Sequence, residues 1–341
     1  MKKALPIIIL SLISLCGFSQ RALKSDFTVM FYNVENLFDT IDHPDFTDEE
    51  FSPESEKNWN TERYTKKLDD LSAVLSSQNK KELPEIIGLA EVENKRVLQD
   101  LIATKNLEDG NYEIIHEEGK DARGIDVALL YRKNELKSVN FESIEITFPF
   151  DSSLTTRDIL HVWGKTEDGE DIHFFVNHWS SRIGGERETE PKRMYAAVTL
   201  RRQLDLLFSK EKNPRIVIMG DFNDEPTNKS LMNILLAGNK LKNIATGDLY
   251  NLFYDKHNQY NEGSYNYRNN WNMLDHIIVS YNLINQEGKY SCNYDSGKII
   301  KEEFMLYENN QGQQVPNRTY GGPNYYGGIS DHFPIMVKFT K

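Results

Sequence analysis

Polar side chains stand at the ends of short apolar runs throughout this chain of 341 residues. Ser330-Asp331-His332 precedes an apolar run at 335–337, and Gly220-Asp221-Phe222-Asn223 follows another at 216–219. Apolar runs of this length are typical of buried strands. The pattern therefore predicts sheets whose ends carry acidic, amide and imidazole groups.

The rest of the chain alternates strands with two helices. Many connections have hairpin length, which favours packed sheets with helices outside over a doubly wound parallel sheet. We therefore expect an α/β or α+β sandwich. Helices are predicted at about 61–77 and 191–208, and strands at 28–32, 86–90, 127–131, 160–163, 172–176, 216–219, 277–279 and 335–337.

The first twenty residues have the pattern of a signal peptide. Lys2 and Lys3 precede an apolar run at 4–16, and the small residues Gly17 and Ser19 fit cleavage before Gln20. No later stretch approaches the ~18 apolar residues of a transmembrane helix. We expect a signal peptide at 1–19 and an exported, periplasmic or extracellular protein.

Cys16 offers a lipid anchor as the alternative route of export. The residue before it is Leu15, where lipoprotein signals carry a small residue, so anchoring is disfavoured. Removal of the signal leaves Cys292 as the only cysteine, which excludes an internal disulfide and a cysteine metal cluster. Without repeats or low-complexity segments, residues 20–341 are predicted to form one domain, and nothing indicates a stable protein partner.

The charge of the chain limits the ways in which it could bind nucleic acid. With 40 Lys and Arg against 52 Asp and Glu, the formal net charge is −12. Proteins that hold nucleic acid by bulk electrostatics neutralise phosphates with lysine and arginine. The acidic balance argues against that class, but it does not exclude an enzyme whose bound metal supplies positive charge locally.

Six polar elements at strand ends form an ordered series. Taken singly, each is explained most simply as a turn or cap, but together they are hard to explain in that way. The series resembles the endonuclease/exonuclease/phosphatase superfamily, whose members are similar to pancreatic deoxyribonuclease, and it covers nearly the whole chain. Its members are Asn33-x-Glu35, Glu91, His178, Gly220-Asp221-x-Asn223, Asp275-His276 and Ser330-Asp331-His332.

The resemblance implies a four-layer sandwich of two mainly antiparallel sheets flanked by helices, and metal-dependent attack of water on a phosphorus ester. Glu91 would be the principal Mg²⁺ ligand, with Asn33 and Asp331 building or orienting the metal shell. Carboxylate and amide oxygens also suit Mn²⁺. Glu35 stands where many relatives carry aspartate, so direct metal contact and a supporting role both remain open for it.

The same resemblance implies catalytic roles for the remaining residues. Asp221 would orient or deprotonate the attacking water, and Asn223 would donate to a phosphate oxygen. His332 would contact the scissile phosphate, while Asp275 fixes its tautomer and favours its charged form. His178 would donate a second hydrogen bond to the phosphate. The sequence does not choose the general base.

Two loops carry candidates for substrate binding. Arg182 and Arg187 follow His178 and could each bind a flanking phosphate, or could pair with the glutamates at 186, 188 and 190. Tyr325 belongs to a loop at 317–328 that is rich in tyrosine and glycine. Its ring could stack on a base or pack on the sheet edge.

These observations predict a secreted, Mg²⁺-dependent phosphoesterase. The leading expectation is an endonuclease that cuts DNA or RNA and leaves a 5′-phosphate. The alternative is a phosphatase or phosphodiesterase that acts on small phosphorylated molecules or phospholipid head groups. A non-catalytic binding protein that has kept the fold is the third class.

Overall fold

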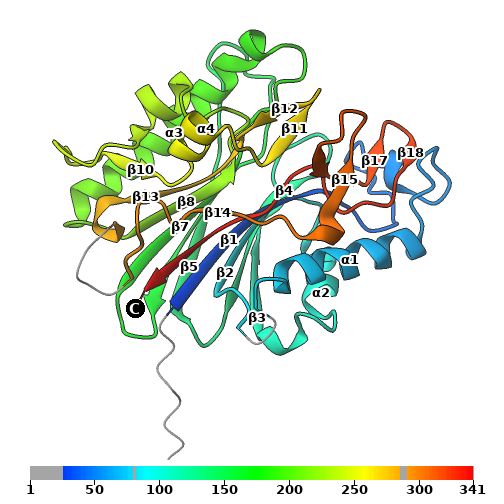
Figure 1. Cartoon of the computed structure of the whole chain (residues 1–341), viewed down its shortest axis with the longest axis horizontal. Coiled ribbons are helices and arrows are strands. Elements are labelled where there is room, and N and C mark those ends of the chain that lie inside the picture. Colours follow the sequence, from blue (N-terminus) through cyan, green and yellow to red (C-terminus); the bar gives the residue numbers. More distant parts are fainter. Residues whose placement is uncertain (1–25, 80–81, 285–289, 341) are drawn as a thin grey trace, which may run out of the picture.

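Two β-sheets packed face to face form the centre of the molecule (Figure 1). The computed structural model describes residues 26–79, 82–284 and 290–340, so the predicted signal peptide at 1–19 and Cys16 lie outside the described residues. Within the described part of the chain, no helix has the length and apolar character needed to cross a membrane.

The first sheet has 6 strands. In spatial order they are β14 (Lys298–Ile299), β19 (Ile335–Thr340), β1 (Asp26–Leu37), β2 (Ile86–Val92), β4 (Asp126–Arg132) and β3 (Tyr112–His116). The second sheet has 7 strands. In spatial order they are β5 (Leu136–Ile144), β6 (Ile159–Thr166), β7 (Asp171–His178), β8 (Ile216–Asp221), β13 (Asp275–Ser280), β10 (Leu249–Asn251) and β9 (Ala237–Gly238).

Short hairpins and helices complete the fold. The hairpins pair β11 (Tyr265–Tyr267) with β12 (Asn270–Asn272), β15 (Leu306–Glu308) with β16 (Gln314–Pro316), and β17 (Tyr320–Gly321) with β18 (Asn324–Tyr325). The α-helices are α1 (Thr61–Ser76), α2 (Lys95–Ile102), α3 (Glu186–Lys210) and α4 (Tyr254–Tyr260).

Apolar side chains divide the molecule into four layers. Phe31 of β1 and Met219 of β8 belong to the core between the two sheets. On the outer face of the first sheet, Leu71 of α1 packs in one cluster with residues of β1, β2 and α2. Leu200 of α3 packs in the cluster on the outer face of the second sheet. The predicted four-layer sandwich is confirmed.

Each long helix connects two parallel strands. β1 and β2 pair in parallel and are joined through α1, while β7 and β8 pair in parallel and are joined through α3. Such a connection needs a crossover, which a helix on the outer face supplies. Most other strand pairs in the two sheets are antiparallel, as predicted, but the first sheet also holds one parallel pair and the second holds two, β7 with β8 and β9 with β10.

The predicted strands and the first helix agree with the structure, but the second helix begins earlier than expected. α3 starts at Glu186, and Pro191 lies inside it. A proline at this position forgoes one backbone hydrogen bond near the start of the helix. Buried Arg193 anchors this part of the helix by donating to Asp224 Oδ1 at 2.6 Å and to Thr189 Oγ1 at 2.7 Å.

Candidate active site

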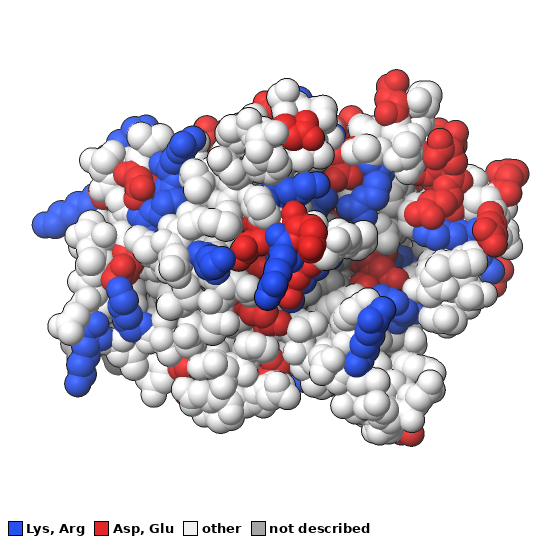
Figure 2. Space-filling view, turned by 90° about the horizontal axis from the view of Figure 1, so that it is seen from above, with Lys and Arg blue, Asp and Glu red and all other residues white. Residues whose placement is uncertain are grey.

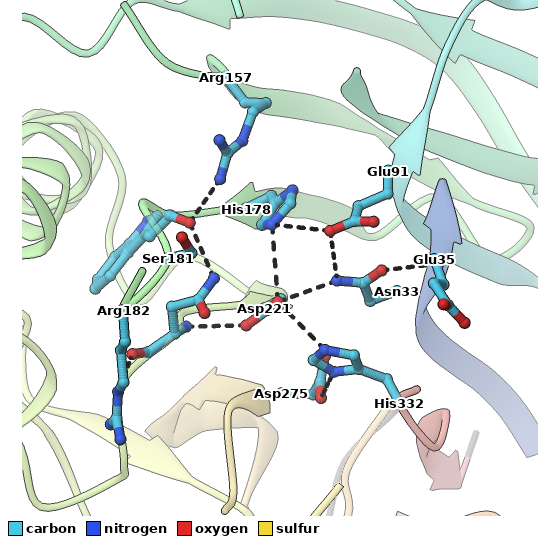
Figure 3. A network of polar contacts seen from close by, with 12 residues as sticks. Asn33, Glu35, Glu91, Arg157, His178, Ser181, Arg182, Asp221, Asp275 and His332 are labelled. Carbon is cyan, nitrogen blue, oxygen red and sulfur yellow. Dashed lines mark hydrogen bonds and ion pairs between the residues drawn. The ribbon is translucent and has the colours of Figure 1, made fainter. Parts of the chain in front are cut away.

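Strand register brings the predicted polar residues to one end of both sheets (Figure 3). His178 is the partner of Asp221 across β7 and β8, and Asp275 is the partner of Asp221 across β8 and β13. In the other sheet Asn33 of β1 lies opposite the residue before Glu91 of β2. The two sheets thus meet at an end lined with carboxylate, amide and imidazole groups.

Left-handed backbone conformations direct three of these side chains. Glu35, Glu91 and Asn223 have φ values of 50°, 65° and 51°. Glu91 stands where the pairing of β2 with β4 shifts register. Bulges of this kind re-aim side chains and are frequent beside active sites, where backbone strain is retained. The alternation of a regular strand would not place Glu91 in this way.

Asn33, Glu91 and Asp221 share one polar cluster. The amide nitrogen Nδ2 of Asn33 lies 3.1 Å from Asp221 Oδ2 and 3.4 Å from Glu91 Oε1. Its amide oxygen accepts a hydrogen bond from the backbone N–H of Glu35 at 3.0 Å. In this arrangement Asn33 bridges two carboxylates as a donor, and its amide would have to turn over to become a metal ligand.

His178 faces the same two carboxylates. Its Nε2 lies 3.7 Å from Glu91 Oε1 and 3.7 Å from Asp221 Oδ2. Burial and the nearby Arg157 and Arg123 hold the pKa of His178 well below its usual range. The ring is therefore neutral at pH 7, and it can donate through only one of its nitrogens.

His332 and Asp275 form a buried pair beside Asp221. Nδ1 of His332 lies 2.7 Å from Asp275 Oδ2, and Nε2 lies 3.8 Å from Asp221 Oδ2. Burial lowers the pKa of His332, but the negative charges of Asp275 and Asp221 outweigh this effect and raise it well above 6.5. The ring is held as an imidazolium that can donate to an anion.

Asp275→Asn is expected to move the alkaline limb of the pH–rate profile toward lower pH. The substitution removes the charge that raises the pKa of His332, so the imidazolium loses its proton at a lower pH and activity falls earlier as pH rises. The measurement is kcat/KM against pH at saturating Mg²⁺. Ser264→Ala, which removes only the hydroxyl donor to Asp275, should give a smaller shift. An unmoved alkaline limb in Asp275→Asn would contradict the assigned role.

Asp221 is the buried carboxyl at the centre of the cluster. Burial raises its pKa to about 7, against the opposing effect of His332. The backbone N–H of Asn223 donates to its Oδ1 at 2.9 Å, and the amide of Asn223 donates to the Trp179 carbonyl at 3.1 Å. A carboxyl with a pKa near neutrality can exchange a proton with water at physiological pH.

Glu35 supports the site instead of pointing freely into it. Its two carboxylate oxygens accept from the backbone N–H groups of Thr319, at 2.7 Å, and Tyr320, at 3.3 Å. Nζ of the buried Lys67 donates to the Glu35 carbonyl at 3.1 Å. Of the two roles that the sequence leaves open for Glu35, these contacts favour the supporting one.

Asp331 is paired with an arginine that sequence reasoning did not single out. Nη2 of Arg318 lies 2.6 Å from Asp331 Oδ2, and both side chains line the cleft described below. The ring of Tyr265 lies 4.8 Å from that of His332. Arg318 and Tyr265 lie outside the strands of the main sheets, so apolar periodicity gave no signal for either.

Arg157 is a second residue that the sequence interpretation missed. It lies just before β6, donates to the Trp179 carbonyl at 2.7 Å and pairs with Asp121 at 2.9 Å. It also lines the cleft. Because β6 and β7 are antiparallel, the start of β6 lies beside the end of β7 that carries His178. The rule that polar residues at strand ends converge would have found Arg157.

The three predicted substrate-binding residues lie in different surroundings. Arg182 lines the cleft, where its Nε donates to the Asn223 carbonyl at 2.8 Å. Arg187 is exposed on the first turn of α3 and is not among the residues that line the cleft. The guanidinium of Arg63 lies over the ring of Tyr325, 4.1 Å from the ring centroid, and the ring of Tyr325 also packs against Tyr320. The structure therefore favours the packing alternative.

The donor atoms of the site fit a hard divalent cation. Oxygen donors come from Glu91, Asp221, Asp275 and Asp331, which line or adjoin one cleft, and Oδ1 of Asp275 is buried with no protein partner. Ligand atoms of Asp221, Asp275 and His332 all lie within 4.8 Å of one another. Carboxylate oxygens suit Mg²⁺ and Mn²⁺, and burial of several of them favours an added positive charge.

Glu91, His178, Asp221, Asp331 and His332 line a cleft of about 1290 Å³. A family model for the endonuclease/exonuclease/phosphatase family matches residues 28–341. The chain belongs to this family. Its members are phosphoesterases, which accords with the resemblance found in the sequence. A search of curated proteins finds no match.

Solved structures of this family share the fold at low sequence identity. A family protein from Bacteroides thetaiotaomicron has a TM-score of 0.57 and 17% identity, covering 93% of this chain and 95% of that one. D. rerio TDP2 in complex with a single-strand DNA product has a TM-score of 0.56 and 15% identity, over 93% and 100% of the two chains. The B. thetaiotaomicron mannosyl-6-phosphatase has a TM-score of 0.52 and 18% identity, over 92% and 99%.

Proposed function

We propose that this protein is a divalent-metal-dependent phosphoesterase that hydrolyses a phosphate ester with water. The observation that carries the proposal is the pair formed by His332 and Asp275 at 2.7 Å, which faces Asp221 in the same cleft as Glu91. An anion-binding imidazolium beside a carboxyl with a pKa of about 7 provides an electrophilic group and a proton acceptor for one reaction.

The side chains divide the work of hydrolysis. Glu91 and Asp331, with Asn33 if its amide turns, would hold Mg²⁺ or Mn²⁺. A bound ion of this kind would act as a Lewis acid on a phosphate oxygen. Asp221 orients the attacking water and takes its proton. His332, His178 and Asn223 donate hydrogen bonds to phosphate oxygens as negative charge develops there.

Chelation is expected to abolish activity, and added Mg²⁺ to restore it. Glu91→Gln should raise the Mg²⁺ concentration for half-maximal rate by on the order of tenfold or more, because a neutral amide replaces a charged ligand. The assay follows phosphate or alcohol release over a Mg²⁺ titration. Glu108→Gln, which changes an exposed carboxylate that does not line the cleft, is the matched control. Undiminished hydrolysis in excess chelator would refute the metal-dependent mechanism.

The narrower form of this proposal concerns the substrate. Polynucleotide cleavage was the leading expectation from the sequence, and a structural neighbour holds a single-strand DNA product. Hydrolysis of a small phosphoester was the alternative, and another neighbour is a mannosyl-6-phosphatase. The catalytic residues are the same for both activities, so only a test on substrates distinguishes them. The protein is incubated with supercoiled plasmid, single-stranded DNA, RNA and a panel of small phosphoesters.

We also propose that the protein is exported after cleavage of residues 1–19. The basic, apolar and small-residue segments of that stretch support the proposal. Expression of the full chain, with cell fractionation and mass measurement of the product, tests it. A cytoplasmic product that retains Met1 or Lys2 would contradict it.

A further inference from the structure

The cleft carries no excess of basic side chains. Its lining includes six lysines and arginines and eight aspartates and glutamates, of which Glu91 and Asp331 would hold the metal. The cations are Lys57, Arg123, Arg157, Arg182, Lys192 and Arg318, and the acids are Glu35, Glu50, Glu56, Glu91, Asp121, Glu186, Asp221 and Asp331.

Most of the cations in the cleft already have carboxylate partners. Five of the six lie 2.6–3.8 Å from a carboxylate oxygen. The pairs are Lys57 with Glu50, Arg123 and Arg157 with Asp121, Arg182 with Glu186, and Arg318 with Asp331. A polynucleotide gains affinity by exchanging small counterions for lysine and arginine, and here it would have to displace carboxylates instead.

One rim of the cleft is acidic. Glu50 and Glu56 line it, and exposed acidic residues at 42, 45, 49 and 54 belong to the same segment. In Figure 2, which looks down on the molecule from above Figure 1, acidic side chains gather at the right edge, while lysines and arginines are more frequent on the left. A polyanion that extends across the cleft would therefore meet like charge on one side.

The hairpin of β11 and β12 lines another part of the cleft with aromatic rings. Tyr265 lies beside His332, with 4.8 Å between ring centroids, and Tyr267 stacks on Tyr265 at 6.5 Å with an interplanar angle of 11°. Tyr267 is 52% exposed, and Asn270 and Asn272 of the same hairpin also line the cleft. Exposed rings with neighbouring amides suit a polar ring, and the Arg268 guanidinium, 5.1 Å from the ring centroid of Tyr267, adds a hydrogen-bond donor beside them.

We propose that the cleft takes a small phosphomonoester whose neutral polar ring lies against Tyr265 and Tyr267, in preference to a polynucleotide. This inference rests on the proposed phosphoesterase function. In the reaction the oxygen of water bonds to phosphorus and the ester P–O bond breaks. The leaving alcohol takes a proton, and inorganic phosphate is released. One phosphoryl group occupies the region of His332, and the rest of the substrate brings no further charge to a cleft whose cations are mostly paired with carboxylates.

The first experiment compares kcat/KM for several substrates in the presence of Mg²⁺. A hexose 6-phosphate and a nucleoside 5′-monophosphate test the two kinds of ring, glycerol phosphate lacks a ring, and a single-stranded oligonucleotide represents the polymer. We expect one of the ring monoesters to have the highest kcat/KM. A higher value for the oligonucleotide would overturn the inference but leave the phosphoesterase proposal intact. Hydrolysis of none of them would count against both.

Variants of Tyr267 test the ring contact. Tyr267→Ala should raise KM for the preferred ring monoester by about fivefold relative to glycerol phosphate, and Tyr267→Phe should restore most of the difference. Tyr326→Ala removes another exposed ring, one that is not among the cleft residues, and should change neither value. An equal effect of Tyr267→Ala on both substrates would contradict the proposed contact.

Oligonucleotide binding in excess chelator gives a readout that does not depend on turnover. Fluorescence anisotropy of a labelled single strand should show weak binding to the wild-type protein. The double variant Glu50→Gln/Glu56→Gln should bind it about tenfold more tightly at low salt, because two charges at the rim are removed. Tight binding by the wild-type protein, unchanged in the double variant, would overturn the charge argument.

Discussion

His332→Ala is expected to lower kcat by on the order of 10² or more, with the fold retained. His332 is the group that the buried Asp275 and Asp221 hold in its charged form, so alanine removes both the hydrogen bond to phosphate and the local positive charge. Because this interaction strengthens as negative charge develops on phosphate, its loss should appear in kcat more than in KM. Steady-state kinetics on the best substrate of the panel measures both.

Two controls separate catalysis from folding. His43→Ala removes an exposed histidine that does not line the cleft and should retain wild-type kinetics. Near-UV circular dichroism and the thermal midpoint of His332→Ala show whether the sheet end remains ordered. A well-folded His332→Ala enzyme with kcat within a few-fold of wild type would remove His332 from the mechanism.

The sequence predicted which polar residues the fold brings together, because most of them stand at the ends of regular elements. Asp221 follows the apolar run at 216–219, and Asp275 precedes the run at 277–279. The antiparallel register of the two strands then makes these residues neighbours. His178 joins them through the parallel pairing of β7 with β8. Short continuous apolar runs locate strand ends to within a few residues, and this precision is sufficient to assemble such a cluster.

What the sequence did not reveal depends on loops and on tertiary contacts. Arg318 and Tyr265 reach the cleft from segments with no apolar period, and their positions follow from how those segments pack. The family resemblance left both metal contact and a supporting role open for Glu35, and the structure turns its carboxylate toward two backbone N–H groups nearly three hundred residues away. No local pattern encodes a contact at that separation.

The same contacts make Lys67 the residue with the largest expected effect on stability. Its buried Nζ donates to the Glu35 carbonyl, to Thr319 Oγ1 at 2.7 Å and to the Ile329 carbonyl. These three acceptors belong to β1 and to both ends of the loop at 319–329. Lys67 therefore ties the loop that precedes Asp331 and His332 to the strand that carries Asn33.

Lys67→Met is expected to lower the free energy of unfolding by about 3–5 kcal/mol, because it leaves buried acceptors unpaired beside the Glu35 carboxylate. Denaturant unfolding in excess chelator measures it. Lys66→Met is the matched control: the neighbouring lysine is about half exposed, pairs with Asp70 and donates to the Gly327 carbonyl of the same loop at 2.9 Å, and as a surface contact it should cost under about 1 kcal/mol. If Lys67→Met lowers the free energy of unfolding no more than Lys66→Met does, Lys67 does not hold the loop at 319–329 to β1.

The stability lost in Lys67→Met should also depend on pH, and the titration of Glu35 decides the direction of this dependence. Burial and the nearby Asp331 raise the pKa of Glu35 from 4.5 to about 7, and Lys67 is the main charge that opposes this rise. Without Lys67 the folded protein holds the Glu35 proton more tightly than the unfolded chain does. Stability of Lys67→Met must then fall as pH rises from about 4.5 through neutrality, because folding has to retain a proton that the unfolded chain releases. The deficit relative to wild type is expected to be larger at pH 8 than at pH 5, and the double variant Lys67→Met/Glu35→Gln should lose most of this dependence.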